Sequence, residues 1–147
     1  MGLLTWSNGD VIYLDAVAVI YSVENVQPYN ELLYPIWQSA AAGQIRLVGS
    51  ELLLLETLVM PIREKDTVLK RAFRHILINS DLELIPISRL ILDQAARVRA
   101  ASSLKTPDAI HAATALSAQC TSFLTNDKGF SRVAGLSIQV LDSILAE

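Results

Sequence analysis

The sequence predicts an α/β fold, a three-layer α/β/α sandwich in which helices cover both faces of a central parallel sheet. Short apolar segments, several of them β-branched, alternate with longer helix-like segments along the whole chain. The first short segment, 11–14, is largely apolar and partly β-branched, which is typical of a strand buried on both faces. No linker, repeat or low-complexity segment interrupts the 147 residues, so we expect one domain spanning 1–147.

The first half of the chain is expected to form two strands and three helices. Strands are predicted at 11–14 and 45–48, and helices at 16–23 and 29–42, the second ending at Gly43. Ser50 is expected to cap a third, apolar helix that ends near Pro61, because proline does not continue a helix.

The second half continues the alternation. Helices are predicted at 67–78, from the Ser88 cap to about 99, and at 106–118, with strands at 82–85, 122–124 and 137–141. Thr106, Pro107 and Asp108 form a strong helix start: a capping hydroxyl, a proline at the first helical position and an acid in the first turn. We therefore expect Asp108 at a helix N-terminus.

Composition points to a protein of the cytoplasm with no membrane-spanning segment. Apolar residues make up 52% of the chain, yet no segment approaches the roughly 20 apolar residues that span a bilayer. The apolar excess is therefore expected in a core or a partner interface. The single cysteine, Cys120, excludes a disulfide framework and is interpreted as a packing residue. No basic residue precedes Arg46, so the basic start of a signal peptide is missing.

Charge is unevenly distributed. Residues 63–105 contain nine basic and five acidic side chains, whereas the rest of the chain contains three basic and ten acidic ones. A basic region beside acidic residues suits a metal-dependent enzyme that acts on a polyanion. A solvated helical face explains the same pattern equally well.

Four carboxylates stand where a parallel sheet would bring them together. Asp15 and Asp127 follow predicted strands, Asp108 opens a helix, and Glu56 lies in the helix after the second strand. Because ligands of such sheets bind at the carboxyl ends of the strands, we expect these four residues to form the catalytic and metal-binding site. An all-oxygen set suits Mg²⁺ or Mn²⁺, which would activate a water molecule at a phosphodiester.

Each acid also has a simpler explanation. Glu56 has four apolar neighbours on its helical face, Leu52, Leu53, Val59 and Met60. Its ionised form would cost several kcal/mol there unless a cation compensates it, although the side chain could instead reach solvent at the helix edge. Asp108 could serve only the helix dipole, and Asp127 could serve only a turn.

Other catalytic motifs are missing or weak. The sequence contains no G-x-G-x-x-G, no Walker loop and no G-x-S-x-G. His75 and His111 are the only histidines, too few for a histidine metal site. His111 follows Asp108 by three residues and could touch the site, but a partly buried helix histidine is the simpler interpretation.

Four segments resemble the motifs of PIN domains, in the family's order. They are Tyr13-Leu14-Asp15-Ala16-Val17, Ser50-Glu51-Leu52-Leu53-Leu54-Leu55-Glu56, Thr106-Pro107-Asp108-Ala109-Ile110-His111-Ala112-Ala113, and Phe123-Leu124-Thr125-Asn126-Asp127. The third segment is the most specific and is similar to VapC toxins. The resemblance implies that Asp15, Glu56, Asp108 and Asp127 are the family's acids, with Asn126 as a possible helper.

The resemblance also implies a function. VapC-like proteins are Mg²⁺- or Mn²⁺-dependent ribonucleases that cleave RNA, work as homodimers and are neutralised by a VapB-like antitoxin. One departure matters, because the family usually places hydroxyl or amide side chains after the first acid, whereas this chain has Ala16 and Val17. Two alternatives therefore stay open: a degenerate PIN domain that binds RNA or a protein partner without catalysis, and an acid-cluster phosphoesterase acting on small substrates.

Overall fold

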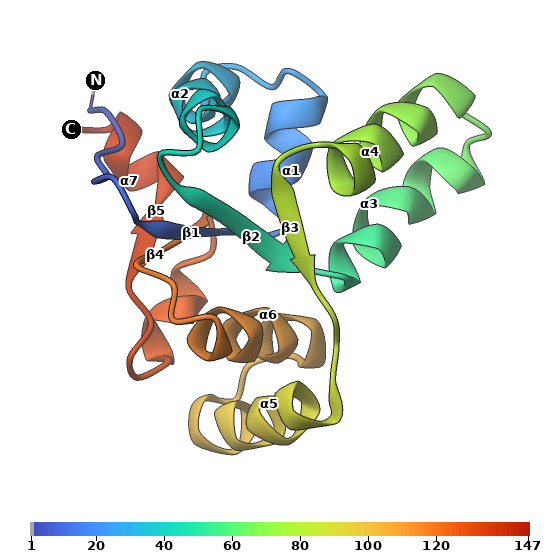
Figure 1. The fold of residues 1–147 in the computed structure, drawn as a ribbon. Helices are drawn as coiled ribbons and strands as arrows, with labels where there is room; N and C mark the ends of the chain where they lie inside the picture. Colours follow the sequence, from blue (N-terminus) through green and yellow to red (C-terminus); the bar gives the residue numbers. More distant parts are fainter. Residues whose placement is uncertain (1) are drawn as a thin grey trace.

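The computed structural model describes residues 2–147, which form five strands, seven α-helices and one short 3₁₀ helix (Figure 1). The elements are, in chain order, β1 (Val11–Leu14), α1 (Ala16–Val23), α2 (Tyr29–Ala41), β2 (Arg46–Ser50), α3 (Leu52–Arg63), α4 (Thr67–Asn79), β3 (Leu82–Ile85), α5 (Arg89–Ser102), α6 (Thr106–Ser117), β4 (Ser122–Thr125), η1 (Lys128–Arg132), β5 (Ile138–Val140) and α7 (Leu141–Leu145).

The sheet is parallel throughout, with the order β3-β2-β1-β4-β5. Central strand β1 pairs with β2 on one side and with β4 on the other; Tyr13 lies opposite both Val48 and Phe123. Strands β2 and β3 lie on one side of β1, and β4 and β5, which come later in the chain, lie on the other side. The order thus reverses between β1 and β4, and ligands of open α/β sheets bind at such a point, beyond the carboxyl ends of the strands.

Helices cover both faces of the sheet, as the sequence predicts. Alternate residues of β1 face opposite cores: Ile12 and Leu14 pack with α1 to α4 and α7, whereas Tyr13 packs with α5, α6 and η1. Figure 1 shows α5 and α6 together on one side of the sheet and α1 to α4 on the other. The three-layer α/β/α arrangement is confirmed. No helix within residues 2–147 combines the length and apolarity needed to cross a membrane.

Element boundaries differ from the predictions in several places. Strand β2 runs to Ser50, two residues further than predicted, so Glu51 and not Ser50 takes the cap position of α3. Ser50 still contributes there, because its Oγ accepts a hydrogen bond of 3.0 Å from the amide of Leu52. Helix α3 continues through Pro61 to Arg63, so the proline lies in the last turn, where few helix bonds are left to lose. Thr106 is the first residue of α6 and not its cap; Lys105 takes the cap position, with no side-chain capping bond. The final strand is shorter than predicted, and Leu141 instead begins α7, which buries Leu141 and Ile144.

Candidate metal-binding active site

Asp15 is a buried carboxylate at the end of the central strand. It is the N-cap of α1, where its Oδ1 accepts a hydrogen bond of 3.1 Å from the amide of Ala18. The residue is only 7% exposed. Burial raises the pKa of Asp15 to about 6, and the charge of Glu56 adds to this, although hydrogen bonds from Thr125 and Ala18 and the proximity of His111 act in the opposite direction. The protein thus holds Asp15 in a place where its negative charge is unfavourable.

Asp127 follows the neighbouring strand β4 and is exposed. It is the N-cap of η1: its Oδ1 accepts a bond of 2.8 Å from the amide of Gly129. Its own amide donates to Oγ1 of Thr125 at 2.9 Å. A Cβ added at Gly129 would lie 3.0 Å from Oδ1 of Asp127, so glycine leaves room for this carboxylate. The turn chemistry considered for Asp127 is therefore present.

Asp108 lies in the first turn of α6, as predicted, and is half-buried. Burial is the main reason that the pKa of Asp108 is raised, and the negative charges of Asp127 and then Glu56 add to it. His111 and Lys105 act in the opposite direction. The helix dipole explains why an acid suits this position, while burial and the neighbouring acids raise its pKa.

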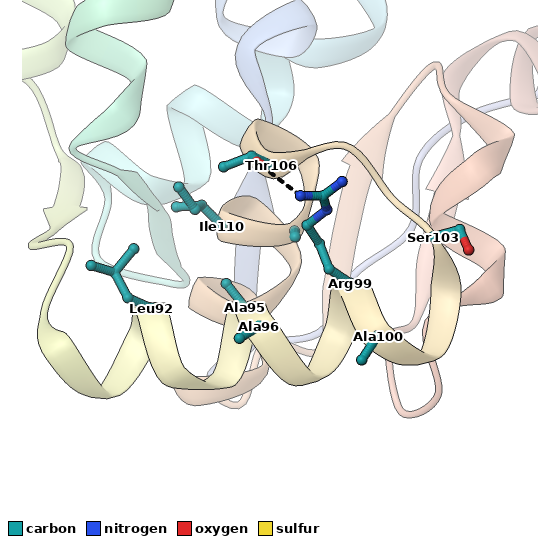
Figure 2. Close-up of a pocket in the computed structure, with 9 residues that line it drawn as sticks. Leu92, Ala95, Ala96, Arg99, Ala100, Ser103, Thr106 and Ile110 are labelled. Atoms are coloured by element: carbon teal, nitrogen blue, oxygen red, sulfur yellow. Dashed lines mark hydrogen bonds between the residues drawn. The ribbon is translucent and has the colours of Figure 1, made fainter.

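Arg99 of α5 fixes the point at which α6 begins. Its guanidinium group donates to the carbonyl of Leu104 at 2.8 Å and to Oγ1 of Thr106 at 3.2 Å. Figure 2 shows this side chain rising from α5 toward Thr106, beside a groove of about 610 Å³ between the two helices. The groove is lined by Thr106, Ala109 and Ile110 of α6. At 100° per residue, Asp108 lies on another face of that helix, so the groove is separate from the acids.

Glu56 projects from α3 and meets α6. Its Oε1 lies 2.5 Å from Nε2 of His111, and Nδ1 of the same ring lies 2.5 Å from Oη of Tyr13. The Glu56 side chain is 25% exposed. Of its four apolar neighbours on α3, Leu53 is buried, whereas Val59 and Met60 are exposed. Glu56 is therefore not enclosed by apolar side chains as the sequence suggested. Its carboxylate instead contacts the buried polar residue His111.

Charges among the four acids affect the pKa values of Asp15 and Asp108, but the four side chains are not grouped as a complete set of metal ligands within residues 2–147. The negative charge of Glu56 raises the pKa of Asp15, and the charges of Asp127 and Glu56 raise the pKa of Asp108. Within residues 2–147, no Lys or Arg forms an ion pair with any of the four. In the same residues, no three His, Cys, Asp or Glu side chains are grouped so that they could hold one ion. The assignment of the four as metal ligands therefore stays a prediction.

Two polar residues have roles that the sequence did not reveal. The sequence predicts a partly buried helix histidine that could touch the site; the structure buries His111 and bonds it to both Glu56 and Tyr13. Asn126 has both polar groups of its side chain engaged, donating to Oη of Tyr21 at 3.2 Å and accepting from the amide of Asp142 at 2.8 Å. These bonds give Asn126 a structural function, which fastens the loop after β4 to α1 and α7.

Comparison with known proteins identifies the family. A family model described as PIN domain matches residues 12–136, which is most of the chain and includes all four acids. The chain belongs to the PIN domain family. No curated protein matches it.

Solved structures of a toxin and of toxin–antitoxin complexes share the fold of this PIN domain. One is VapBC2 from Rickettsia felis, bound to a DNA fragment from its promoter, with a TM-score of 0.70 and 16% identity over 88% of this chain and 98% of that one. A toxin–antitoxin complex from Klebsiella pneumoniae gives 0.65 and 22% identity, over 85% and 94%. VapC20 from Mycobacterium tuberculosis, a toxin that cleaves the sarcin-ricin loop, gives 0.67 and 16%, over 85% and 95%. At these identities the likeness shows the fold.

Proposed function

We propose that this PIN domain is a divalent-metal-dependent endoribonuclease and the toxin of a toxin–antitoxin pair. One observation carries the proposal. Asp15, at the end of the central strand, is buried with a pKa raised to about 6; the charge of Glu56 adds to this rise, and no Lys or Arg of residues 2–147 forms an ion pair with Asp15. Such a site is stabilised by a bound cation. The PIN match and the VapC20 structure support RNA as the substrate.

The donor set fits Mg²⁺ or Mn²⁺. Every proposed ligand, Asp15, Glu56, Asp108 and Asp127, supplies carboxylate oxygen, which these hard ions prefer. Such an ion keeps several water ligands and needs few protein ligands. This agrees with acids that raise one another's pKa values, although no three of them are grouped around one point in residues 2–147. When bound, the ion would neutralise charge at a phosphodiester and lower the pKa of a water molecule.

The chain's own residues prepare this site in different ways. The amide of Ala18 donates to Oδ1 of Asp15 and so orients its carboxylate. Arg99 fixes the start of α6 and with it the position of Asp108. The basic side chains Lys70, Arg71 and Arg74 of α4 are proposed to contact RNA phosphates, because cations on one helix attract a polyanion.

The proposed partners are RNA, a VapB-like antitoxin and a second copy of the chain, in the cytoplasm. The antitoxin is supported by the similar structures, two of which are toxin–antitoxin complexes. The homodimer is supported by exposed apolar side chains on α3, where Leu55 is 67% and Ile62 is 55% exposed. These residues also line a groove of about 540 Å³, and apolar surface of this kind usually marks an interface.

The test is cleavage of a fluorescent RNA by the full-length protein in Mg²⁺, Mn²⁺ or EDTA. We expect cleavage only with a divalent ion, and its loss in Asp108→Asn. Asp93→Asn is the matched control, because Asp93 is an exposed acid that pairs with Arg97 on the outer helix α5. Cleavage in EDTA, or full activity of Asp108→Asn, would contradict the proposal.

A second function is a PIN domain that binds RNA or a protein partner without cutting. The observation that favours it is the absence of a hydroxyl at the first two positions of α1, Ala16 and Val17. Under this alternative, RNA binding weakens with rising salt, but no cleavage occurs with any divalent ion. Binding and cleavage measured on the same RNA therefore separate the two functions.

A further inference from the structure

We propose that His111 is a positioning residue for Glu56: held by Tyr13, its imidazole fixes one carboxylate oxygen of Glu56 and leaves the other for a metal ion. The metal part of this inference rests on the proposed function. The statement that His111 fixes one oxygen of Glu56 does not rest on it, because it concerns only contacts within the chain.

Both ring nitrogens of His111 are engaged. Nε2 lies 2.5 Å from Oε1 of Glu56 on α3, and Nδ1 lies 2.5 Å from Oη of Tyr13 on β1. The residue is 2% exposed. The ring therefore cannot turn without breaking two hydrogen bonds in a place that water does not reach, and α6, α3 and β1 are joined at one point.

The hydrogen bonds assign the position of the ring proton. Tyr13 is fully buried, and its ring stacks on Phe123 with centroids 4.8 Å apart and planes 6° apart. An ionised carboxylate can only accept a hydrogen bond, so Nε2 of His111 carries the proton and donates to Oε1 of Glu56. In a neutral imidazole Nδ1 is then the acceptor, and the hydroxyl of Tyr13 donates to it.

This arrangement has a consequence for Glu56. A glutamate on a partly exposed helix face ordinarily samples several rotamers, and an ion that binds it must restrict them. The N–H of His111 already fixes Oε1, and within residues 2–147 no hydrogen bond engages Oε2. Supporting residues that orient a metal ligand typically contribute about 10–100-fold in metal affinity or activity.

Metal affinity of the full chain tests the role. Tyr13→Phe keeps the stacked ring and removes only the hydroxyl, His111→Leu removes both bonds, and His111→Gln keeps an N–H donor and a carbonyl acceptor. By isothermal titration with Mn²⁺, we expect Kd to rise about tenfold for Tyr13→Phe and at least as much for His111→Leu. His111→Gln should stay within about threefold of the wild type. His75→Gln is the control, since His75 is exposed on α4.

Nitrogen-15 NMR gives a readout that needs neither metal nor activity. In His75→Gln, the only imidazole signal comes from His111. We expect the neutral Nε2–H form, and we expect Tyr13→Phe to lose the hydrogen-bond shift at Nδ1. A proton on Nδ1, or an Mn²⁺ affinity unchanged in both Tyr13→Phe and His111→Leu, would overturn the inference. If the wild type binds no Mn²⁺, the proposed function fails instead, and the NMR spectra still decide whether His111 orients Glu56.

Discussion

Asp15 and Asp127 occupy equivalent places in the fold but different environments. Each follows one of the two strands between which the sheet order reverses, and each caps the next helix through Oδ1, to Ala18 in one case and Gly129 in the other. Asp15 is buried beneath α1, with its pKa raised to about 6 by burial, whereas Asp127 is exposed. Capping thus explains why an acid is present at both positions, but it does not explain why the protein buries one of them.

The difference indicates unequal roles. An exposed cap contributes about 1 kcal/mol and can be replaced by water or by another polar residue. A buried carboxylate with a raised pKa lowers the stability of the folded state at neutral pH, so its presence is better explained by a ligand than by structure. We therefore expect substitutions at the two positions to differ in activity, stability and metal response.

The largest expected effect is on RNA cleavage. Asp15→Asn should lower kcat/KM about a thousandfold, roughly 4 kcal/mol, because an amide does not hold a hard cation as a carboxylate does. Asp127→Asn should lower it about tenfold, because water can replace an exposed ligand of Mg²⁺ or Mn²⁺. Steady-state cleavage rates measure both. Equal losses at the two positions would remove the distinction between them.

The next effect is on stability as a function of pH, without metal. The pKa of Asp15 is about 6 in the folded protein, above the ordinary value of about 3.9, so the unfolded chain loses this proton first. The stability that Asp15 contributes should therefore fall as pH rises from about 4 to 7, by about 3 kcal/mol at most. Asp15→Asn removes this loss while keeping an oxygen to cap α1.

Urea unfolding at pH 4 and pH 7 measures the change. We expect Asp15→Asn to be more stable than the wild type at pH 7 and similar to it near pH 4. Asp127→Asn is the matched control, since it is also a strand-end cap but lies in solvent. A wild type that is the more stable protein at pH 7 would show that Asp15 is primarily structural.

The order of strands and helices could be predicted because it depends on local features. Val11–Leu14 is a short, largely apolar segment, Ser88 caps α5 through the amide of Ile91, and Asp108 lies in a first helical turn. Each feature is visible within a few residues of sequence. The boundaries at Pro61 and Leu141 were missed because packing against the rest of the chain determines them. Pro61 is buried in the last turn of α3, and Leu141 is buried in α7.

The places of the four acids in the fold could be predicted from the sequence, but the side chains that contact Glu56 could not. The His111 contacts join residues 55 and 98 positions apart, which no local pattern encodes. A signal was nevertheless present: Tyr13 is a phenol within an apolar strand, Glu56 has apolar neighbours, and His111 interrupts an alanine-rich helix. Each polar group needed a buried partner, and pairing the three with one another would have satisfied them all.

Metal should stabilise the folded protein in proportion to the role of each acid. At a hundredfold excess over Kd, a ligand specific for the folded state contributes about 2.7 kcal/mol, which corresponds to a rise in Tm of roughly 5–10 °C for a domain of this size. We expect this rise in the wild type with Mn²⁺, most of it in Asp127→Asn, and little of it in Asp15→Asn. Differential scanning fluorimetry at constant ionic strength measures it. An equal rise in all three proteins would indicate binding elsewhere.

The smallest expected effect concerns the residues after Asp15. Ala16→Thr combined with Val17→Ser places hydroxyls at the first two positions of α1, where they can orient water beside the carboxylate; cleavage should rise about tenfold. Ala16→Val combined with Val17→Ala has nearly the same shape without the hydroxyls and is the matched control. A similar rise in the control would mean that packing, and not a hydroxyl, limits the rate.

The position of the ion itself tests the central claim most directly. Crystals of the full chain grown with Mn²⁺ and measured at the manganese absorption edge locate the metal by its anomalous signal. We predict one strong peak at the carboxyl ends of β1 and β4, within bonding distance of a carboxylate oxygen of Asp15 and of Asp108, and absent from Asp15→Asn. A manganese peak away from these residues, or none at saturating Mn²⁺, would contradict the account.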